Sequence, residues 1–405
     1  MIFYEENPGK IGRADVVIAI PTFNEARNIA QTIVKVTEGV EKYLGGFNAV
    51  LINCDNNSTD GTKEIFFNTP SSLPKIYLST PPNVIGKGSN LKNLFLKARE
   101  LEAQVVIVLE CDIENLSPYW IRALGQPVLK GAAFVHPLYV RHKYESPLSS
   151  AITYPLTRCL YGRRVRQLDA GDVAFSGDMV ETFLGTPVWN EAVEKAGIDV
   201  WMSTVAMRAR VPICQSVMNL PKIHRIKDPY GQVTVRFVQI LSVIFELMIA
   251  YRSFWEKVKW SKPTILFSFN SQGIQAPPPP VEVSIERLYE RFLRGFDEYQ
   301  EMWQEVFDKE TYNKLQEIKN LDLHHFSFPS QTWATILFDG SIAYRDSSES
   351  RRPQLLRSFL PLYFGKVVSF VKRTERMSIQ QAEDYVEATC EVFEESKPYL
   401  IHRWR

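Results

Sequence analysis

Glu110 and Asp112 stand two residues apart, directly after the apolar run Val105–Leu109. A short run of β-branched and apolar residues predicts a buried strand. Side chains at positions i and i+2 of an extended segment point to the same side, so both carboxylates can approach one ligand. Hard oxygen donors suit Mg²⁺ or Mn²⁺, which usually bridge to substrate phosphates. The pair therefore predicts a divalent-metal site at the end of a strand, with a solvated acidic turn as the alternative.

Polar residues also follow three earlier predicted strands. Asn24 and Glu25 follow 16–20, Asp55 and Ser58 follow 49–53, and Gly86 and Lys87 follow 75–79. Each has a structural alternative, as a helix start, a turn former or a solvated helix-end charge. Because polar residues occur at the ends of successive strands, a nucleotide site is favoured. Neither the GxGxxG pattern nor the GxxxxGK[ST] loop is present.

The elements that must position these residues alternate between strand and helix. After the strand at 16–20, apolar residues recur at helical spacing from Ile29 to Val40. Such alternation predicts a parallel, doubly wound α/β sheet. Ligands of open α/β sheets bind beyond the carboxyl ends of the strands, which is where the polar residues fall.

Composition limits the kind of partner. The chain has 405 residues, a net charge of +1, 23% charged and 45% hydrophobic residues, which is ordinary for a globular protein and long enough for two domains. Without a basic excess, no nucleic-acid partner is expected. Five scattered cysteines without a CxxC pair indicate neither a zinc site nor a disulfide framework, and a cytoplasmic location is expected.

The first residues carry no signal-peptide apolar segment. The apolar stretch 233–250 is interrupted by Arg236, Gln239 and Glu246, so we expect a core or dimer-interface helix and no membrane span. Four consecutive prolines at 277–280 predict a stiff linker or a docking strap.

Three regions follow from this reading: a nucleotide-binding domain at 1–262, a Pro/aromatic linker at 263–280 and a mostly helical region at 281–405. The helical region shows no site chemistry. We interpret its aromatic residues as packing or oligomerisation surface, and a homodimer is expected.

Four segments resemble the nucleotide-sugar signatures of GT-A glycosyltransferases: Ile20-Pro-Thr-Phe-Asn-Glu25, Asp55-Asn-Asn-Ser-Thr-Asp-Gly-Thr62, Gly86-Lys-Gly88 and Glu110-Cys-Asp112. Residues 147–225 are similar to the acceptor region of glucosyl-3-phosphoglycerate synthases and glucosylglycerate synthases. The resemblance covers residues 14–260. It implies a GT-A fold, Rossmann-like with a mainly parallel sheet, followed by the mostly helical C-terminal region.

The resemblance also implies roles for individual residues. A Mg²⁺ or Mn²⁺ ion would be held by Asp112 and His224, the diphosphate would meet Lys87, and catalysis would rest on Asp199, Asp112 and Lys87. The nucleotide sugar would be bound by Pro21, Thr22, Asn24, Glu25, Asp55, Ser58, Gly86, Lys87, Glu110 and Cys111. The acceptor would be bound by Thr153, Arg158, Arg166, Gly171, Asp172 and Asp199.

Two positions depart from the family pattern. Glu110 is one methylene longer than the aspartate expected there, which leaves its direct metal ligation open. Ala151 stands where phosphoglycerate-using relatives carry an arginine, and losing that bidentate phosphate contact favours unphosphorylated glycerate as acceptor. The arginines that could supply a phosphate contact instead are Arg158, Arg163, Arg164 and Arg166.

The expected activity is retaining transfer of glucose from a nucleoside diphosphate glucose to the 2-hydroxyl of D-glycerate, which would make glucosylglycerate, a compatible solute. Transfer to 3-phosphoglycerate and mannosyl transfer to glycerate are alternatives, and the donor's base is not identified. Three further alternatives stay open: an inverting polysaccharide or lipid-carrier transferase with Asp172 or Asp199 as base, a nucleotidyltransferase, and an inactive sugar-nucleotide sensor.

Overall fold

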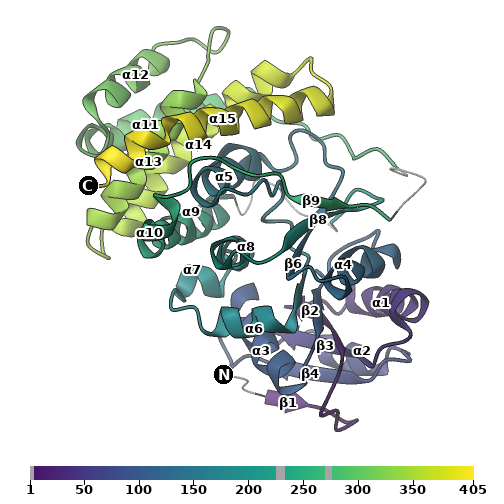
Figure 1. The fold of residues 1–405 in the computed structure, drawn as a ribbon. Coiled ribbons are helices and arrows are strands. Elements are labelled where there is room, and N and C mark those ends of the chain that lie inside the picture. Colours follow the sequence, from purple (N-terminus) through teal and green to yellow (C-terminus); the bar gives the residue numbers. More distant parts are fainter. Residues whose placement is uncertain (1–3, 225–232, 270–275) are drawn as a thin grey trace. The chain divides into compact units, whose positions relative to one another are not determined.

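The computed structural model describes residues 4–224, 233–269 and 276–405 (Figure 1). They fall into two compact units through which the chain passes repeatedly. The first unit comprises Met1–Val140, Val165–Asp228 and Pro263–Pro278, and the second comprises Arg141–Arg164, Pro229–Lys262 and Pro279–Arg405.

The first unit is built on a nine-stranded sheet with the order β1-β4-β3-β2-β5-β7-β6-β8-β9. The strands are β1 Tyr4–Glu6, β2 Val16–Thr22, β3 Ala49–Asp55, β4 Lys75–Ser79, β5 Val105–Val108, β6 Phe134–Leu138, β7 Val173–Ser176, β8 Ile213–Val217 and β9 Ile265–Phe267. Strands β4, β3, β2 and β5 run parallel, as do β6, β8 and β9, whereas β7 is antiparallel to both of its neighbours. The sheet is therefore mixed but mainly parallel, as predicted.

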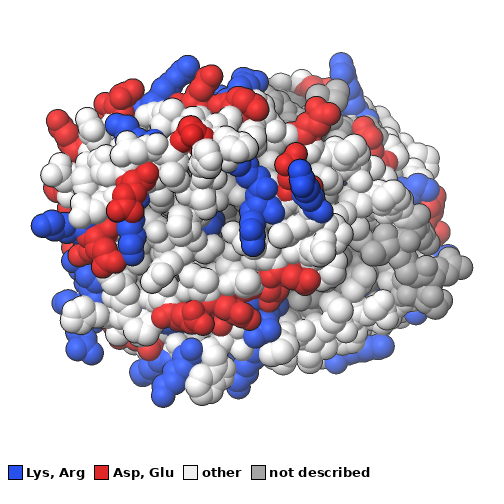
Figure 2. All heavy atoms as spheres, turned by 90° about the horizontal axis from the view of Figure 1, so that it is seen from above, with Lys and Arg blue, Asp and Glu red and all other residues white. Residues whose placement is uncertain are grey.

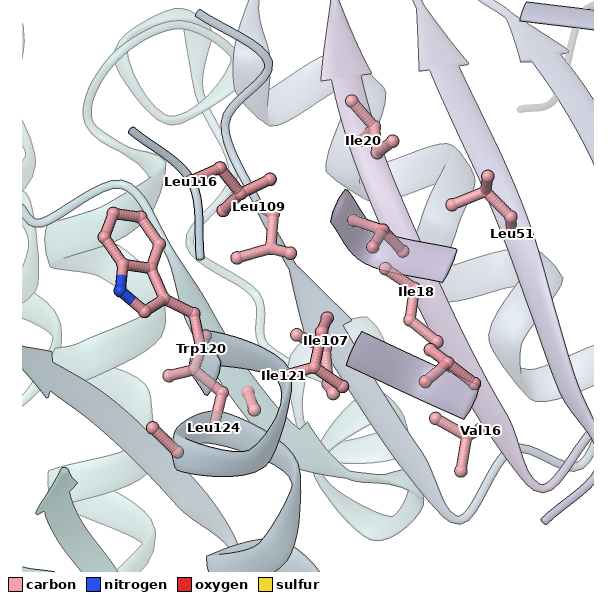
Figure 3. Packing of buried hydrophobic residues seen from close by; sticks show 14 of the residues in the cluster. Val16, Ile18, Ile20, Leu51, Ile107, Leu109, Leu116, Trp120, Ile121 and Leu124 are labelled. Carbon is pink, nitrogen blue, oxygen red and sulfur yellow. The ribbon is translucent and has the colours of Figure 1, made fainter. Parts of the chain in front are cut away.

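Helices of the first unit are α1 Ile29–Leu44, α2 Thr62–Asn68, α3 Lys87–Glu100, α4 Tyr119–Leu129, α6 Gly177–Leu184, α7 Glu191–Glu194 and α8 Ile198–Ala209. Figure 3 shows alternate β2 residues, Val16, Ile18 and Ile20, on one face of the sheet in the cluster that includes Trp120 of α4. Successive side chains of a strand point to opposite faces of the sheet. Because the intervening Val17 is also fully buried, the sheet is covered on both faces.

Register places the ends of β2 and β3 side by side. The two strands pair from Val16↔Ala49 to Thr22↔Asp55. Both are two residues longer than predicted, so the polar residues Thr22 and Asp55 belong to the strands and are buried. The loops that follow them are thereby held next to each other at the carboxyl edge of the sheet.

The second unit is helical. It contains the π-helical segment Ser149–Thr153, α5 Tyr154–Tyr161, α9 Val233–Ala250, α10 Arg252–Trp255, α11 Ile285–Val306, α12 Lys309–Lys319, α13 Ser330–Asp346, α14 Arg352–Thr374 and α15 Ile379–Arg403.

On the face of the molecule seen in Figure 2, acidic and basic side chains are interspersed, in keeping with the small net charge of the chain.

One helix in the described part of the chain, α9, is long and apolar enough to cross a membrane, with a mean hydropathy of 1.9 and 44% of the stretch buried. Within its unit, α9 packs on α13 and α14. The carboxylate of Glu246 in α9 accepts hydrogen bonds from Arg352 Nη1 at 3.0 Å and from the Tyr344 hydroxyl at 2.8 Å. These contacts agree with the core-helix interpretation of 233–250.

The two units differ from the continuous regions predicted at 1–262, 263–280 and 281–405. Residues 141–164 belong with the helices, because Arg158 and Tyr154 bond to α15. Residues 263–278 belong with the sheet, because β9 pairs in parallel with β8. The segment predicted as a linker therefore contributes an edge strand.

Candidate active site

Three possible metal ligands converge beyond the carboxyl end of β5. One ligand atom from each of Glu110, Asp112 and His224 lies within 4.8 Å of the others. The carboxylate of Asp112 is 3.3 Å from His224 Nδ1, and Glu110 Oε2 is 3.9 Å from His224 Nε2. All three side chains remain partly exposed, so an ion could enter. Carboxylate and imidazole ligands together suit Mn²⁺ as well as Mg²⁺.

A short backbone pairing brings His224 to this place, although it lies 112 residues from Asp112. Ile113 and His224 form an antiparallel bridge, and Glu114 N–H donates to the Ile223 carbonyl at 2.9 Å. The structure thus brings the two predicted metal ligands together.

Lys87, the first residue of α3, enters the same cluster from another direction. Its Nζ donates to Asp199 Oδ1 at 2.8 Å and to the Gly171 carbonyl at 2.7 Å, and it lies 3.4 Å from Glu110 Oε1. Burial by itself would lower the pKa of Lys87, but the charges of Asp199 and Glu110 outweigh it and raise the pKa to about 12. Lys87 is therefore charged at neutral pH and is not the solvated helix-end charge considered as an alternative.

Lys222 is a member of the cluster to which the sequence analysis gave no role. Its Nζ lies 2.7 Å from Glu110 Oε2 and 2.6 Å from Asp172 Oδ2, and donates to the Ala170 carbonyl at 2.8 Å. The side chain is only 1% exposed. Its position two residues before His224, in a segment already singled out, was the one available signal.

Asp172 and Gly171 hold the cluster from the side of β7. Asp172 is fully buried and accepts hydrogen bonds from the Tyr139 hydroxyl at 2.6 Å and the Glu110 N–H at 2.7 Å. Gly171 has a φ of +87°, and a Cβ there would lie 2.3 Å from the carboxylate carbon of Glu110. The glycine is therefore required both by backbone conformation and by the closeness of Glu110.

Asp55 is the centre of a second hydrogen-bonded group, between the ends of β2 and β3. Its carboxylate is fully buried and accepts from the Thr22 hydroxyl at 2.6 Å, the Tyr77 hydroxyl at 2.8 Å, and both the N–H and the hydroxyl of Ser58 at 2.6 Å. Burial and the charge of Asp55 raise the pKa of Tyr77, which keeps its phenol a donor. A nucleobase that reached Asp55 would have to replace one of these donors.

The loop after β2 is tied to the loop after β3. Asn24, at a φ of +56°, donates its N–H to the Ser58 hydroxyl at 2.7 Å and accepts from Thr59 N–H at 3.1 Å. Glu25 N–H donates to the Thr62 hydroxyl at 2.9 Å. Asparagine tolerates the left-handed conformation better than most residues. The predicted donor-binding residues here therefore form one connected surface, with Pro21 half-buried beside it.

Two predicted nucleotide-binding residues, Gly86 and Cys111, have surroundings that also give them a structural role, and their binding role stays a prediction. A Cβ on Gly86 would lie 2.1 Å from the Glu194 carbonyl oxygen, and one on neighbouring Gly88 would lie 1.9 Å from the Val193 carbonyl oxygen. Close approach of that backbone to the start of α3 thus explains both glycines. Cys111 is 3% exposed, its carbonyl accepts from the Thr32 hydroxyl at 3.0 Å, and its side chain belongs to the core behind the cluster.

The predicted acceptor residues divide between the two units. Gly171, Asp172, Asp199 and Arg166 belong to the first unit, whereas Thr153 and Arg158 belong to the second. The predicted acceptor role of these residues stays a prediction.

Within its helical unit, Arg158 is fully buried. It donates from Nη1 to Glu387 at 2.6 Å and from Nε to Glu394 at 2.9 Å. That is the environment of a structural ion pair, and it offers no support for Arg158 as a phosphate contact. The hydroxyl of Thr153 is also buried and has no hydrogen-bond partner in the described part of the chain.

Residues 17–179 match the family model of glycosyl transferase family 2. This segment runs from β2 into α6 and contains Lys87, Glu110, Asp112 and Asp172. The predicted GT-A fold, with its mainly parallel sheet and a helical C-terminal region, is therefore confirmed.

Solved structures of glucosyl-3-phosphoglycerate synthase from Mycobacterium tuberculosis are also similar to this chain. The complex with Mn²⁺, UDP and glucosyl-3-phosphoglycerate is 19% identical, over 57% of this chain and 80% of that one, with a TM-score of 0.46. The complex with Mn²⁺, UDP-glucose and glycerol 3-phosphate is 20% identical over the same shares, with a TM-score of 0.43. The complex with Mg²⁺ and UDP is 18% identical over 58% and 79%, with a TM-score of 0.45. A search of curated protein sequences found no match.

Proposed function

We propose that this protein transfers glucose from a nucleoside diphosphate glucose to the 2-hydroxyl of D-glycerate, with retention of configuration and with Mg²⁺ or Mn²⁺ on the donor diphosphate. The observation that carries the proposal is the convergence of Asp112, His224 and Lys87 on one cluster at the carboxyl end of β5, with Asp112 and Lys87 inside the matched glycosyltransferase segment. The choice of glucose and glycerate rests on the resemblance of residues 147–225 to glucosylglycerate-forming enzymes.

In this mechanism Asp112 and His224 would hold the ion, which supplies Lewis-acid stabilisation of the departing diphosphate. Lys87, charged and 18% exposed, would exchange its contacts with Asp199 and Gly171 for diphosphate oxygens. Asp199 would then be available to orient sugar or acceptor hydroxyls. The bond from the sugar C1 to the phosphate oxygen breaks, the bond from C1 to the acceptor oxygen forms on the same face, and the acceptor proton passes to the departing phosphate.

The inverting alternative needs a catalytic base, and the surroundings of one of its two candidates disfavour it. Asp172 is fully buried and bonds to Lys222 and Tyr139. Asp199 bonds to Lys87, and in the mechanism above it orients hydroxyls once Lys87 has turned to the diphosphate. We therefore propose the retaining reaction, in which neither carboxylate needs to take a proton.

The acceptor proposal is unphosphorylated glycerate. At Ala151 no guanidinium can extend toward a phosphate, and the Ala151 carbonyl accepts a hydrogen bond from Trp333 Nε1 at 2.7 Å within the helical unit. Arg158 is bonded to two glutamates, and Arg164 Nε donates to the Ser261 hydroxyl at 3.1 Å. Two of the four candidate arginines, Arg158 and Arg164, thus have other partners, which favours an acceptor without a phosphate group.

Turnover assays test this proposal directly. The enzyme is supplied with Mg²⁺ or Mn²⁺, a panel of nucleoside diphosphate sugars, and D-glycerate beside 3-phosphoglycerate. Preference for glucose and glycerate, release of a nucleoside diphosphate and an α-linked product by NMR are expected. Preference for 3-phosphoglycerate would overturn the acceptor assignment, a β-linked product would favour the inverting alternative, and pyrophosphate release would identify a nucleotidyltransferase.

We also propose a cytoplasmic location and a homodimer. The five cysteines are all buried and form no disulfide in the described part of the chain, which suits a reducing compartment. Size-exclusion chromatography with light scattering tests the homodimer, and a monomeric mass would contradict it.

A further inference from the structure

Glu110 is held from both sides by lysines. Its Oε1 lies 3.4 Å from Lys87 Nζ, and its Oε2 lies 2.7 Å from Lys222 Nζ. Behind it, Gly171 approaches so closely that a Cβ would lie within 2.5 Å of three carboxylate atoms. The carboxylate is therefore fixed in one orientation, and its Oε2, the oxygen nearer to His224, is the one bonded to Lys222.

Lys222 holds the Glu110 carboxylate independently of Lys87. It comes from the 221–224 segment, is 1% exposed, and is anchored by Asp172 at 2.6 Å and by the Ala170 carbonyl at 2.8 Å. Asp172 is itself held by Tyr139 and by the backbone N–H of Glu110. A lysine with three oxygen partners in a buried place has little freedom to leave Glu110.

We propose that Lys222 is a positioning residue that keeps Glu110 from becoming a full metal ligand. An oxygen that accepts a short hydrogen bond from an ammonium group is a weaker donor to a cation, so the ion would be held mainly by Asp112 and His224. When Lys87 turns toward the donor diphosphate, Lys222 would also keep the charge of Glu110 balanced. The inference rests on the proposed function, because it assumes a divalent ion at Asp112 and His224.

One anionic ligand, Asp112, beside the neutral imidazole of His224 would draw less charge from the ion than two carboxylates would. Glu110 as a second carboxylate ligand would bind the ion more tightly but would reduce the positive charge that the ion offers to the leaving diphosphate. Lys222 would therefore lower the affinity for the metal ion and increase the stabilisation that the ion gives to the leaving diphosphate.

Mn²⁺ binding measured by calorimetry without donor or acceptor tests the inference in four proteins: wild type, Lys222→Met, Glu110→Gln and the double variant. Lys222→Met should bind Mn²⁺ about tenfold more tightly, because Glu110 Oε2 is released, and this matches the usual scale for residues that orient metal ligands. Glu110→Gln should bind within about twofold of wild type, and the double variant should return to that value. Loss of the Lys222 charge by itself would also favour a cation, so the double variant decides: a gain in Mn²⁺ affinity that persists without the Glu110 carboxylate would contradict the inference.

Several outcomes would overturn the inference. Unchanged or weaker Mn²⁺ binding by folded Lys222→Met contradicts it, and so does a Glu110→Gln variant that loses affinity as strongly as Asp112→Asn. If Lys222→Met does not fold, the Glu110→Gln result decides alone, since Lys222 keeps Asp172 as a partner there. Wild-type protein that binds no Mn²⁺ and shows no turnover would defeat the proposed function itself. Wild-type binding with no effect of Lys222→Met would defeat only the role of Lys222.

Discussion

Both units place cations among carboxylates, but with different outcomes. In the first unit, Glu110, Asp112 and His224 are 23%, 15% and 28% exposed, and their ligand atoms converge. In the second unit, Arg158 is fully buried between Glu387 and Glu394. The first arrangement can still bind an ion, whereas the second uses its charges to join α5 to α15.

Burial alone does not separate a site from a structural ion pair. Lys222 in the first unit is as inaccessible as Arg158 in the second. What differs is the partly exposed group of ligand atoms that Lys222 supports. The comparison therefore predicts that changes in the first unit alter metal binding and turnover, while changes in the second alter stability.

The largest effect is expected for Asp112→Asn and His224→Ala. Loss of a metal ligand should lower kcat by about a thousandfold, on the scale of losing one key charge-stabilising group. The free energy of unfolding should change little, because both side chains are partly exposed. Mn²⁺-dependent turnover and urea unfolding measure the two quantities. His325→Ala is the matched control, since His325 pairs with Asp322 at 2.9 Å on the surface of the second unit. Metal-dependent turnover retained by both variants would remove the site assignment.

Arg158→Met should show the opposite pattern. Breaking a buried ion pair costs about 3–5 kcal/mol, and we expect the lower end here, because Glu394 at 17% exposure would lose its partner while Glu387 at 39% exposure would be solvated. Urea unfolding measures the loss, and Mn²⁺ binding by the folded protein should stay at the wild-type value. Arg294→Met is the control, because its pair with Glu290 is exposed and should be worth at most about 1 kcal/mol. Equal losses in the two variants would contradict the distinction between the units.

Gly171→Ala, compared with Gly131→Ala, tests whether a loss of activity comes from backbone strain or from displacement of the Glu110 carboxylate. An alanine at a φ of +87° costs about 1–2 kcal/mol, and its Cβ would also push the Glu110 carboxylate. We expect kcat/KM to fall about 10- to 100-fold, the usual effect of misplacing a group at the reacting centre. Gly131→Ala carries similar strain, at a φ of +96°, but its Cβ would meet open space. Loss of activity in Gly131→Ala to the same degree would show that strain alone is responsible.

The smallest effect is a pH dependence that arises in the second unit. Burial lowers the pKa of Lys366 to about 7 and that of Lys397 to about 8, from an ordinary 10.5. Between the folded and unfolded pKa values the unfolded chain binds more protons, so these lysines make the free energy of unfolding rise with pH.

From pH 7 to about 8 the rise should come mainly from Lys366, at no more than about 1.4 kcal/mol per pH unit. Urea unfolding at these pH values should show a shallower rise in Lys366→Met than in wild type. If the free energy of unfolding of Lys366→Met rose with pH as steeply as that of wild type, this assignment would be contradicted.

Sequence alone located the strands of the first unit closely. The apolar runs at 16–20, 49–53, 75–79 and 105–109 each form a strand that starts at the predicted residue. Burial on both faces of a parallel strand demands a local run of apolar residues, so the information lies within the segment itself. The same holds for the Glu110 and Asp112 pair, whose common direction follows from strand geometry.

Only the tertiary structure showed which distant side chains meet, because local sequence patterns do not contain this information. His224 could be assigned only by resemblance, and Lys222 was missed, because a lysine in a loop has no pattern that reveals which buried carboxylates it will meet. The allocation of 141–164 to the helical unit depends on Arg158, whose partners lie 229 and 236 residues further along the chain. Side-chain burial and ion pairing between distant segments arise only when the whole chain has packed. The sequence by itself therefore determined the strands and the paired carboxylates, and folding determined which charges form a site and which hold the structure together.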